Sequence, residues 1–95
     1  MSLEKPKESD RERMRRQLDK THTWPCDFMF KFIVPKGNEN EASLRAIFGL
    51  NAKFKFKDSK TGKYRSFTIV DKVDGADAVF VRYEAAAKIP GIISL

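Results

Sequence analysis

The sequence predicts an α+β fold of the ferredoxin-like type, a four-stranded antiparallel sheet with two helices on one face. Three observations predict it. Alternating apolar residues indicate strands, apolar residues at helical spacing indicate helices, and these segments follow in the order strand, helix, strand, strand, helix, strand. That βαββαβ order is the split βαβ unit, for which we expect the strand order 4-1-3-2. With 95 residues, the chain has room for one such domain.

The first strand is predicted from an aromatic alternation that follows Trp24. Phe28, Phe30 and Phe32 occupy every second position, so their face of the strand is expected to point to the core. A turn through Pro35 should end the strand.

The first helix is predicted over residues 39–49. Asn38 is a suitable N-cap, and Gly49 is a typical residue at a helix end. The apolar stripe that this helix should bury consists of Leu44, Ile47 and Phe48.

Residues 52–70 predict a basic β-hairpin, because two alternating runs meet across a short turn. Within the turn at residues 59–63, Gly62 can adopt the positive φ that short hairpin loops need. The side chains of all three long strands that we expect to be buried under the helices are Phe28, Phe30, Phe32, Phe54, Phe56, Phe67 and Ile69.

The second helix is predicted over residues 75–89, with Asp74 as its cap and Pro90 ending it. Residues 92–95 should form a short last strand. The apolar face of the helix is predicted to contain Ala76, Val79, Phe80, Tyr83 and Ala86 or Ala87.

Two regions are expected along the chain. Residues 1–22 are predicted to be a charged, mostly flexible tail, and residues 23–95 the folded domain. Met14 and Leu18 are four residues apart, so a short helix should form in the tail if they find an apolar surface. His22 is interpreted as a solvated linker residue.

The positive charge is concentrated in the hairpin. The chain has 19 Lys and Arg against 13 Asp and Glu, a net charge of +6, and within residues 53–65 the only acid is Asp58. Such a patch favours nucleic acid or another polyanion as a partner. Lysines on an edge strand also prevent edge-to-edge pairing, which is the simpler explanation. The candidate polyanion patch is Lys53, Lys55, Lys57, Lys60, Lys63 and Arg65.

The sheet face away from the helices is predicted to be partly apolar and partly basic. An uncovered face that carries Met29 and Ile33 suggests a protein partner, a second copy of the chain, or cover by the tail. The candidate partner face is Met29, Lys31, Ile33, Tyr64, Ser66 and Thr68.

A candidate ligand loop follows the first strand at Pro35, Gly37 and Asn38, where a helix N-terminus could receive a carboxylate. Three other activities of this topology are disfavoured. RNA-binding relatives need stacking aromatics on the central strands, where only Tyr64 points outward. Acylphosphatases need an Arg in the loop after the first strand, and metal chaperones need a Cys-x-x-Cys there; the chain has neither.

The remaining chemistry is sparse. The single cysteine, Cys26, cannot form an internal disulfide and is interpreted as a packing residue. No residue pattern indicates a cofactor or a metal, and no apolar run is long enough to span a membrane. We therefore expect a cytoplasmic protein without cofactors.

Several spaced residues resemble a known family. They are Trp24-Pro25, Phe28-x-Phe30-Lys31, Ser59-x-x-Gly62-x-Tyr64-x-Ser66-Phe67-Thr68, and Tyr83. Over residues 24–95 this pattern is similar to that of the YbeD-like family of small uncharacterised bacterial proteins. The resemblance implies a fold similar to the ACT domain, a ferredoxin-like module that regulates amino-acid metabolism by binding small ligands, often between paired subunits. It also implies a bacterial cytoplasmic setting.

Taken together, these features predict a non-enzymatic, ACT-like regulatory domain that acts by binding. Its partner is expected to be another protein or a second copy of the chain, with a small-molecule ligand as a further possibility. The alternative is a module that binds nucleic acid or another polyanion through the hairpin at residues 53–65.

Overall fold

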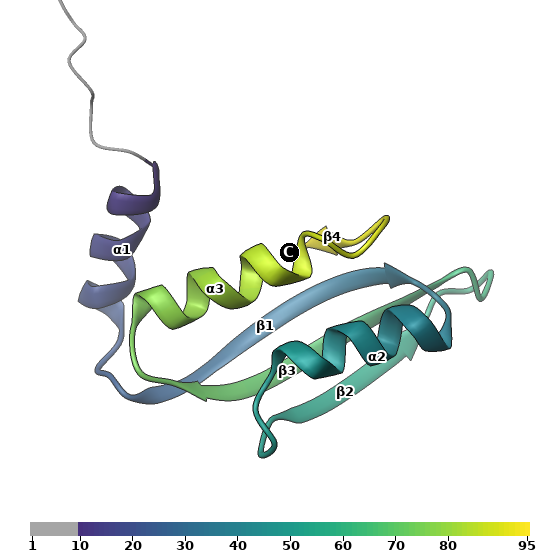
Figure 1. The fold of residues 1–95 in the computed structure, drawn as a ribbon, viewed down its shortest axis with the longest axis horizontal. Coiled ribbons are helices and arrows are strands. Elements are labelled where there is room, and N and C mark those ends of the chain that lie inside the picture. The colour runs from purple at the N-terminus through teal and green to yellow at the C-terminus, as the bar shows by residue number, and fades with distance from the viewer. Residues whose placement is uncertain (1–9) are drawn as a thin grey trace, which may run out of the picture.

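A computed structural model describes residues 10–95 and confirms the α+β ferredoxin-like class. The elements are α1 (Asp10–Thr21), β1 (Cys26–Pro35), α2 (Asn38–Ile47), β2 (Lys53–Asp58), β3 (Tyr64–Val73), α3 (Ala76–Ala86) and β4 (Ile93–Ser94). The strands form one antiparallel sheet in the order β2-β3-β1-β4, which is the predicted order read from the other edge. Helices α2 and α3 lie side by side on one face of this sheet (Figure 1).

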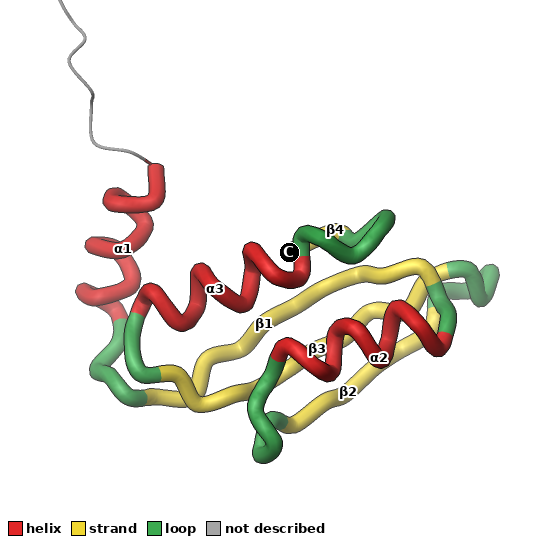
Figure 2. The backbone as a smooth tube through the Cα atoms, in the orientation of Figure 1, coloured by secondary structure: helices red, strands yellow, loops and turns green. Residues whose placement is uncertain are grey.

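The two central strands are long and fully paired with each other. All ten residues of β1 have partners in β3, with Phe30 opposite Ile69 and Phe32 opposite Phe67. The outer strands are shorter: β2 reaches β3 only from Arg65 to Val70, and β4 is two residues long (Figure 2). Among residues 10–95, parts of both central strands are therefore left without an outer neighbour.

The core lies between the sheet and the two helices. Phe30, Phe32, Phe67 and Ile69 are each at most 1% exposed, as predicted. The Phe30 ring packs against the rings of Phe28 and Phe32 on its own strand and of Tyr83 on α3. It also meets Phe48, just after α2, at 5.0 Å between centroids. From α2, α3 and the segments just after them, the residues that join this core are Leu44, Phe48, Val79, Ala86 and Ile89. Ala76 and Phe80 of α3 are also buried.

The prediction that Phe56 is buried was wrong. Its ring is 52% exposed although it lies on the helix side of β2, opposite Phe67. β2 is the edge strand, so no strand of the described part of the chain lies beyond it to cover the ring. The guanidinium of Arg65 stacks on the ring, 4.1 Å from the centroid. Phe28 and Phe54 are half-buried rather than buried.

Both sheet-packed helices begin and end slightly differently from prediction. Gly37 and Gly75 are the N-cap residues, each with extended backbone and no side-chain cap, so Asn38 lies inside α2 and Asp74 lies before the cap of α3. The helices end at Ile47 and Ala86, earlier than predicted.

Two glycines adopt the left-handed backbone conformation at turns. Gly62, with φ of +75°, makes the hairpin turn as predicted. Gly91, with φ of +76°, precedes β4, and a Cβ built there would lie 2.7 Å from Cγ of Pro35. Both the backbone angle and the close approach require glycine at position 91.

Helix α1 packs against α3. Leu18 is half-buried against the core, as the helix prediction requires, whereas Met14 is 57% exposed. Arg11 and Arg15 form ion pairs with Glu84 and Asp77 of α3. The placement of residues 1–9, within the predicted tail, lies outside the described residues, and the domain boundary at residue 23 stays a prediction.

His22 is more packed than a solvated linker residue. It is half-buried, and its ring stacks on Trp24 with 5.2 Å between centroids and lies 5.3 Å from Phe28. The Trp24 indole N–H also donates to Asp19 of α1, at 2.8 Å. These contacts tie the end of α1 to the start of β1.

Candidate interaction surface

The sheet face opposite α2 and α3 brings two predicted sites together. Side chains on this face align in rows across neighbouring strands, because directly opposite residues of an antiparallel pair point to the same side. The rows read Lys72 and Asp27; Lys53, Val70 and Met29; Lys55, Thr68 and Lys31; Lys57, Ser66, Ile33 and Ile93; and Tyr64 and Pro35. We call these residues the open sheet face.

Apolar groups on the open sheet face are substantially accessible. Met29 is 56% exposed, Ile93 50% and Tyr64 43%, while Ile33 and Val70 are half-buried. Beside them stand exposed lysines, namely Lys31, Lys53, Lys55, Lys57 and Lys72. The one acidic side chain in these rows is Asp27, so the face combines accessible apolar surface with strong positive charge.

The hairpin end of this face is hollowed. A cavity of about 330 Å³ lies between Ile33, Tyr64 and the turn, with Lys57 and Lys60 on its wall. Most of the predicted polyanion patch is therefore continuous with the predicted partner face. Four residues of the predicted polyanion patch, Lys53, Lys55, Lys57 and Lys60, thus adjoin the predicted partner face.

Arg65 does not belong to this surface. It lies on the helix side of β3, where its guanidinium donates to Asp58 at 2.6 Å and to Glu41 of α2 at 2.8 Å. The hydrogen bond from Arg65, followed by that from Lys36, lowers the pKa of Asp58 to about 2. Arg65 thus holds the hairpin to α2 and is already committed to carboxylates.

In the candidate ligand loop, the backbone carbonyls of Pro35 and Gly37 are used in structural hydrogen bonds, and Asn38 is the first residue of α2. The carbonyl of Pro35 accepts a hydrogen bond from Asn40 at 3.0 Å, and the carbonyl of Gly37 accepts one from the Glu41 amide at 3.1 Å. Glu39 and Glu41 occupy the first turn of α2, where their charge would oppose a bound anion. A carboxylate site here gains no support from this geometry.

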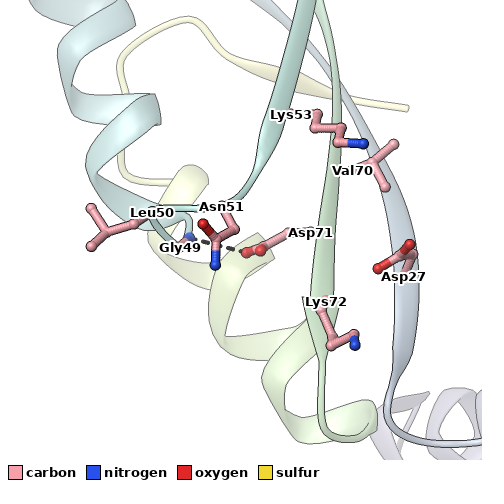
Figure 3. A pocket seen from close by; sticks show the side chains of 8 residues that line it. All are labelled: Asp27, Gly49, Leu50, Asn51, Lys53, Val70, Asp71 and Lys72. Carbon is pink, nitrogen blue, oxygen red and sulfur yellow. Dashed lines mark hydrogen bonds between the residues drawn. The ribbon is translucent and has the colours of Figure 1, made fainter.

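Sequence reasoning missed a buried ion pair. Asp71 is 6% exposed and accepts a hydrogen bond from the Gly49 amide at 3.1 Å (Figure 3). It accepts a second hydrogen bond from Nε of Arg82, also at 3.1 Å. The Arg82 guanidinium also donates to the Ala78 carbonyl at 3.0 Å. The signal in the sequence was an acid on the apolar face of β3, two residues after Ile69. The pair fixes the loop after α2 to α3.

A cavity of about 370 Å³ adjoins this pair, lined by Asp27, Lys53 and Lys72 together with the loop that contains Asn51 (Figure 3). It opens where β3 extends past the first residue of β2. The Asp71 carboxylate is already paired, so it is a structural anchor rather than a free catalytic base.

Within residues 10–95 there is no group of three or more His, Cys, Asp or Glu side chains that could hold a metal ion. In the same range no helix has the length and apolar character needed to cross a membrane. Cys26 is a half-buried free thiol.

A family model matches the chain over residues 19–95. The chain belongs to this family. It is described as "protein of unknown function (DUF493)", and it is the YbeD-like family that the spaced residues of the sequence resemble. The match begins near the end of α1 and includes every strand of the sheet. Neither the curated proteins nor the solved structures contain a significant match to the chain.

Proposed function

We propose that the protein is a non-enzymatic binding domain whose open sheet face binds an acidic surface of another protein. The observation that carries this is the row pattern itself, in which exposed lysines flank Met29, Val70, Ile33 and Ile93. Accessible apolar groups provide the area that association buries, and the lysines select partners with complementary negative charge.

The same rows disfavour self-association through this face. A two-fold axis brings identical patches together, so the lysines of β2 and β1 would meet like charges of the second copy. The exposed lysines would also attract nucleic acid, which is the alternative partner. The accessible side chains next to the lysines are mainly aliphatic, however, and Tyr64 lies at the margin rather than on a central stacking position.

Matched charge reversals test this proposal. Lys53→Glu with Lys55→Glu alters the open sheet face, and Lys20→Glu with Lys88→Glu makes the same change in net charge on exposed positions of α1 and the segment after α3. The full chain, immobilised, is incubated with nuclease-treated extract of its native cells. We expect a captured protein whose binding falls at least tenfold with the first pair only.

Three results would contradict the proposal. Binding that disappears after nuclease treatment would identify a polyanion partner, with the salt dependence that phosphate contacts produce. Equal loss with both pairs would show a nonspecific charge effect. A dimer in sedimentation that only the first pair dissociates would identify self-association.

A further inference from the structure

The outer edge of β1 is only partly occupied. On the side away from β3, β4 pairs with Phe32 and Ile33, and the amide of Leu95 donates to the carbonyl of Lys31 at 2.9 Å. Within residues 10–95 no strand pairs with residues 26–30 on this side. Half of a central strand is therefore an open sheet edge.

The direction of the backbone groups follows from that last hydrogen bond. Along a strand, the N–H and C=O of one residue point to one side and those of the next residue to the other. Because the Lys31 carbonyl points toward β4, the N–H and C=O of Met29 and Asp27 point the same way, into the open edge. Such groups are a template for another strand.

A cavity lies beside this edge on the helix side. Its volume is about 350 Å³, and its walls come from β1, α1, α3 and the end of the chain. The lining residues are Met14, Leu18, Phe28, Val79, Phe80, Tyr83, Ser94 and Leu95. The lining is almost wholly apolar, and burial raises the pKa of the Tyr83 hydroxyl.

We propose that this edge and cavity form a binding site for an extended segment of a partner protein. The segment adds to β1 as an antiparallel strand in line with β4, and its backbone pairs with Asp27 and Met29. Its residues opposite Phe28 and Phe30 point to the helix side, where apolar side chains fill the cavity. The site uses the backbone edge of β1 and the cavity on the helix side rather than the lysine side chains of β2, so it does not depend on the proposed function of the open sheet face.

The open edge of β1 and the apolar cavity beside it together favour a peptide over other ligands. Apolar walls alone would accept any apolar molecule. The backbone amides and carbonyls of the edge, which no strand of residues 10–95 pairs, require donors and acceptors at the spacing of a β-strand, and a polypeptide supplies these. On the open side, the residue opposite Met29 lies diagonal to the exposed Lys31, so an acidic residue at that position of the peptide is complementary.

The first test is amide hydrogen exchange of the free full chain. The amides of Asp27 and Met29 should exchange fast, and those of Phe28 and Phe30, which point to β3, should exchange slowly. If Asp27 and Met29 are protected in the free protein, another part of the chain already occupies the edge and the proposal is wrong.

The second test uses a library of displayed random octapeptides selected on the full chain, followed by synthesis of the enriched sequences. We expect alternating apolar residues, and slowed exchange at Asp27 and Met29 when the peptide is bound. Peptides that protect other strands instead, or a library without a binder tighter than about 1 mM, would overturn the proposal.

Variants separate this site from the open sheet face. Met29→Pro removes a donor of the open edge but no bond to β3, and Met14→Glu puts a charge at the cavity from a position that is 57% exposed. Each should weaken peptide binding at least tenfold. Lys55→Glu, on the open sheet face, should leave it unchanged; equal weakening by Lys55→Glu would contradict a site at this edge.

Discussion

Replacing Phe30 by Ala should remove much of the stability of the fold. Phe30 is fully buried at 0% exposure, and its ring centroid lies 4.8 Å from that of Phe28, 5.0 Å from Phe48 and 5.3 Å from Tyr83. The truncation therefore leaves a cavity between sheet and both helices that neighbouring rings cannot fill. We expect a loss of about 3–5 kcal/mol in the free energy of unfolding.

The matched control is Phe56→Ala, which truncates another phenylalanine on the same side of the sheet. Because the Phe56 ring is 52% exposed and its Arg65 contact is at the surface, this change should cost about 1 kcal/mol. Urea denaturation followed by circular dichroism measures both. For a domain of this size, each kcal/mol lost from the free energy of unfolding lowers the melting temperature by about 4–8 °C, so the melting temperatures of the two variants should differ clearly.

The reasoning would be refuted if the two variants cost the same, or if Phe56→Ala cost more. Either result would mean that β2 carries the core face or that the strand register differs from the one described. Loss of the cooperative unfolding transition in the Phe30→Ala variant would agree with the prediction, since the whole free energy of unfolding of a small domain is only about 5–15 kcal/mol.

Three further predictions concern turns, charge and α1. Gly91→Ala should destabilise the domain by about 1–3 kcal/mol, because position 91 has φ of +76° and a Cβ there would meet the Pro35 ring; an unchanged melting temperature would show that the turn can relax. The lowered pKa of Asp58 means that its contribution to stability is complete above the ordinary carboxyl pKa of 3.8 and is lost as the pH falls toward 2; Asp58→Asn should flatten that part of a stability-against-pH profile, and an unchanged profile would contradict the pairing with Arg65. Deleting residues 1–20 should lower stability but leave the sheet signal in circular dichroism, whereas loss of that signal would make α1 an obligatory part of the fold.

The sheet was predictable because its residues alternate and its turns carry glycine. Phe30, Phe32, Phe67 and Ile69 are buried as the period of two requires, and Gly62 has the expected positive φ. The exposure of Phe56 was not predictable from alternation, since the pattern specifies a side of the strand but not whether a helix covers that part of it.

The surface residues and ion pairs could not be predicted from the sequence, because their contacts depend on strand register and on where the helices cross the sheet. Arg65 follows Lys63 in a basic run, yet the register puts it opposite Asp58, on the helix side, where a salt bridge occupies it. The Asp71 and Arg82 pair joins residues 11 apart whose contact depends on how α3 crosses the sheet. Likewise, the open edge of β1 exists because β4 is short, and strand ends are what a sequence pattern defines least well.

Site-specific photo-crosslinking tests the central claim, that the open sheet face binds an acidic protein, most directly. A photoreactive phenylalanine analogue replaces Thr68, in the middle row of the face, or Val81, which is 56% exposed on α3 and serves as control. In native cells we predict a protein adduct from position 68 that withstands nuclease, is absent from position 81, and disappears when Lys53 and Lys55 are changed to Glu. Adducts of equal yield at both positions, or adducts at position 68 that consist of nucleic acid or of a second copy of the chain, would contradict the claim.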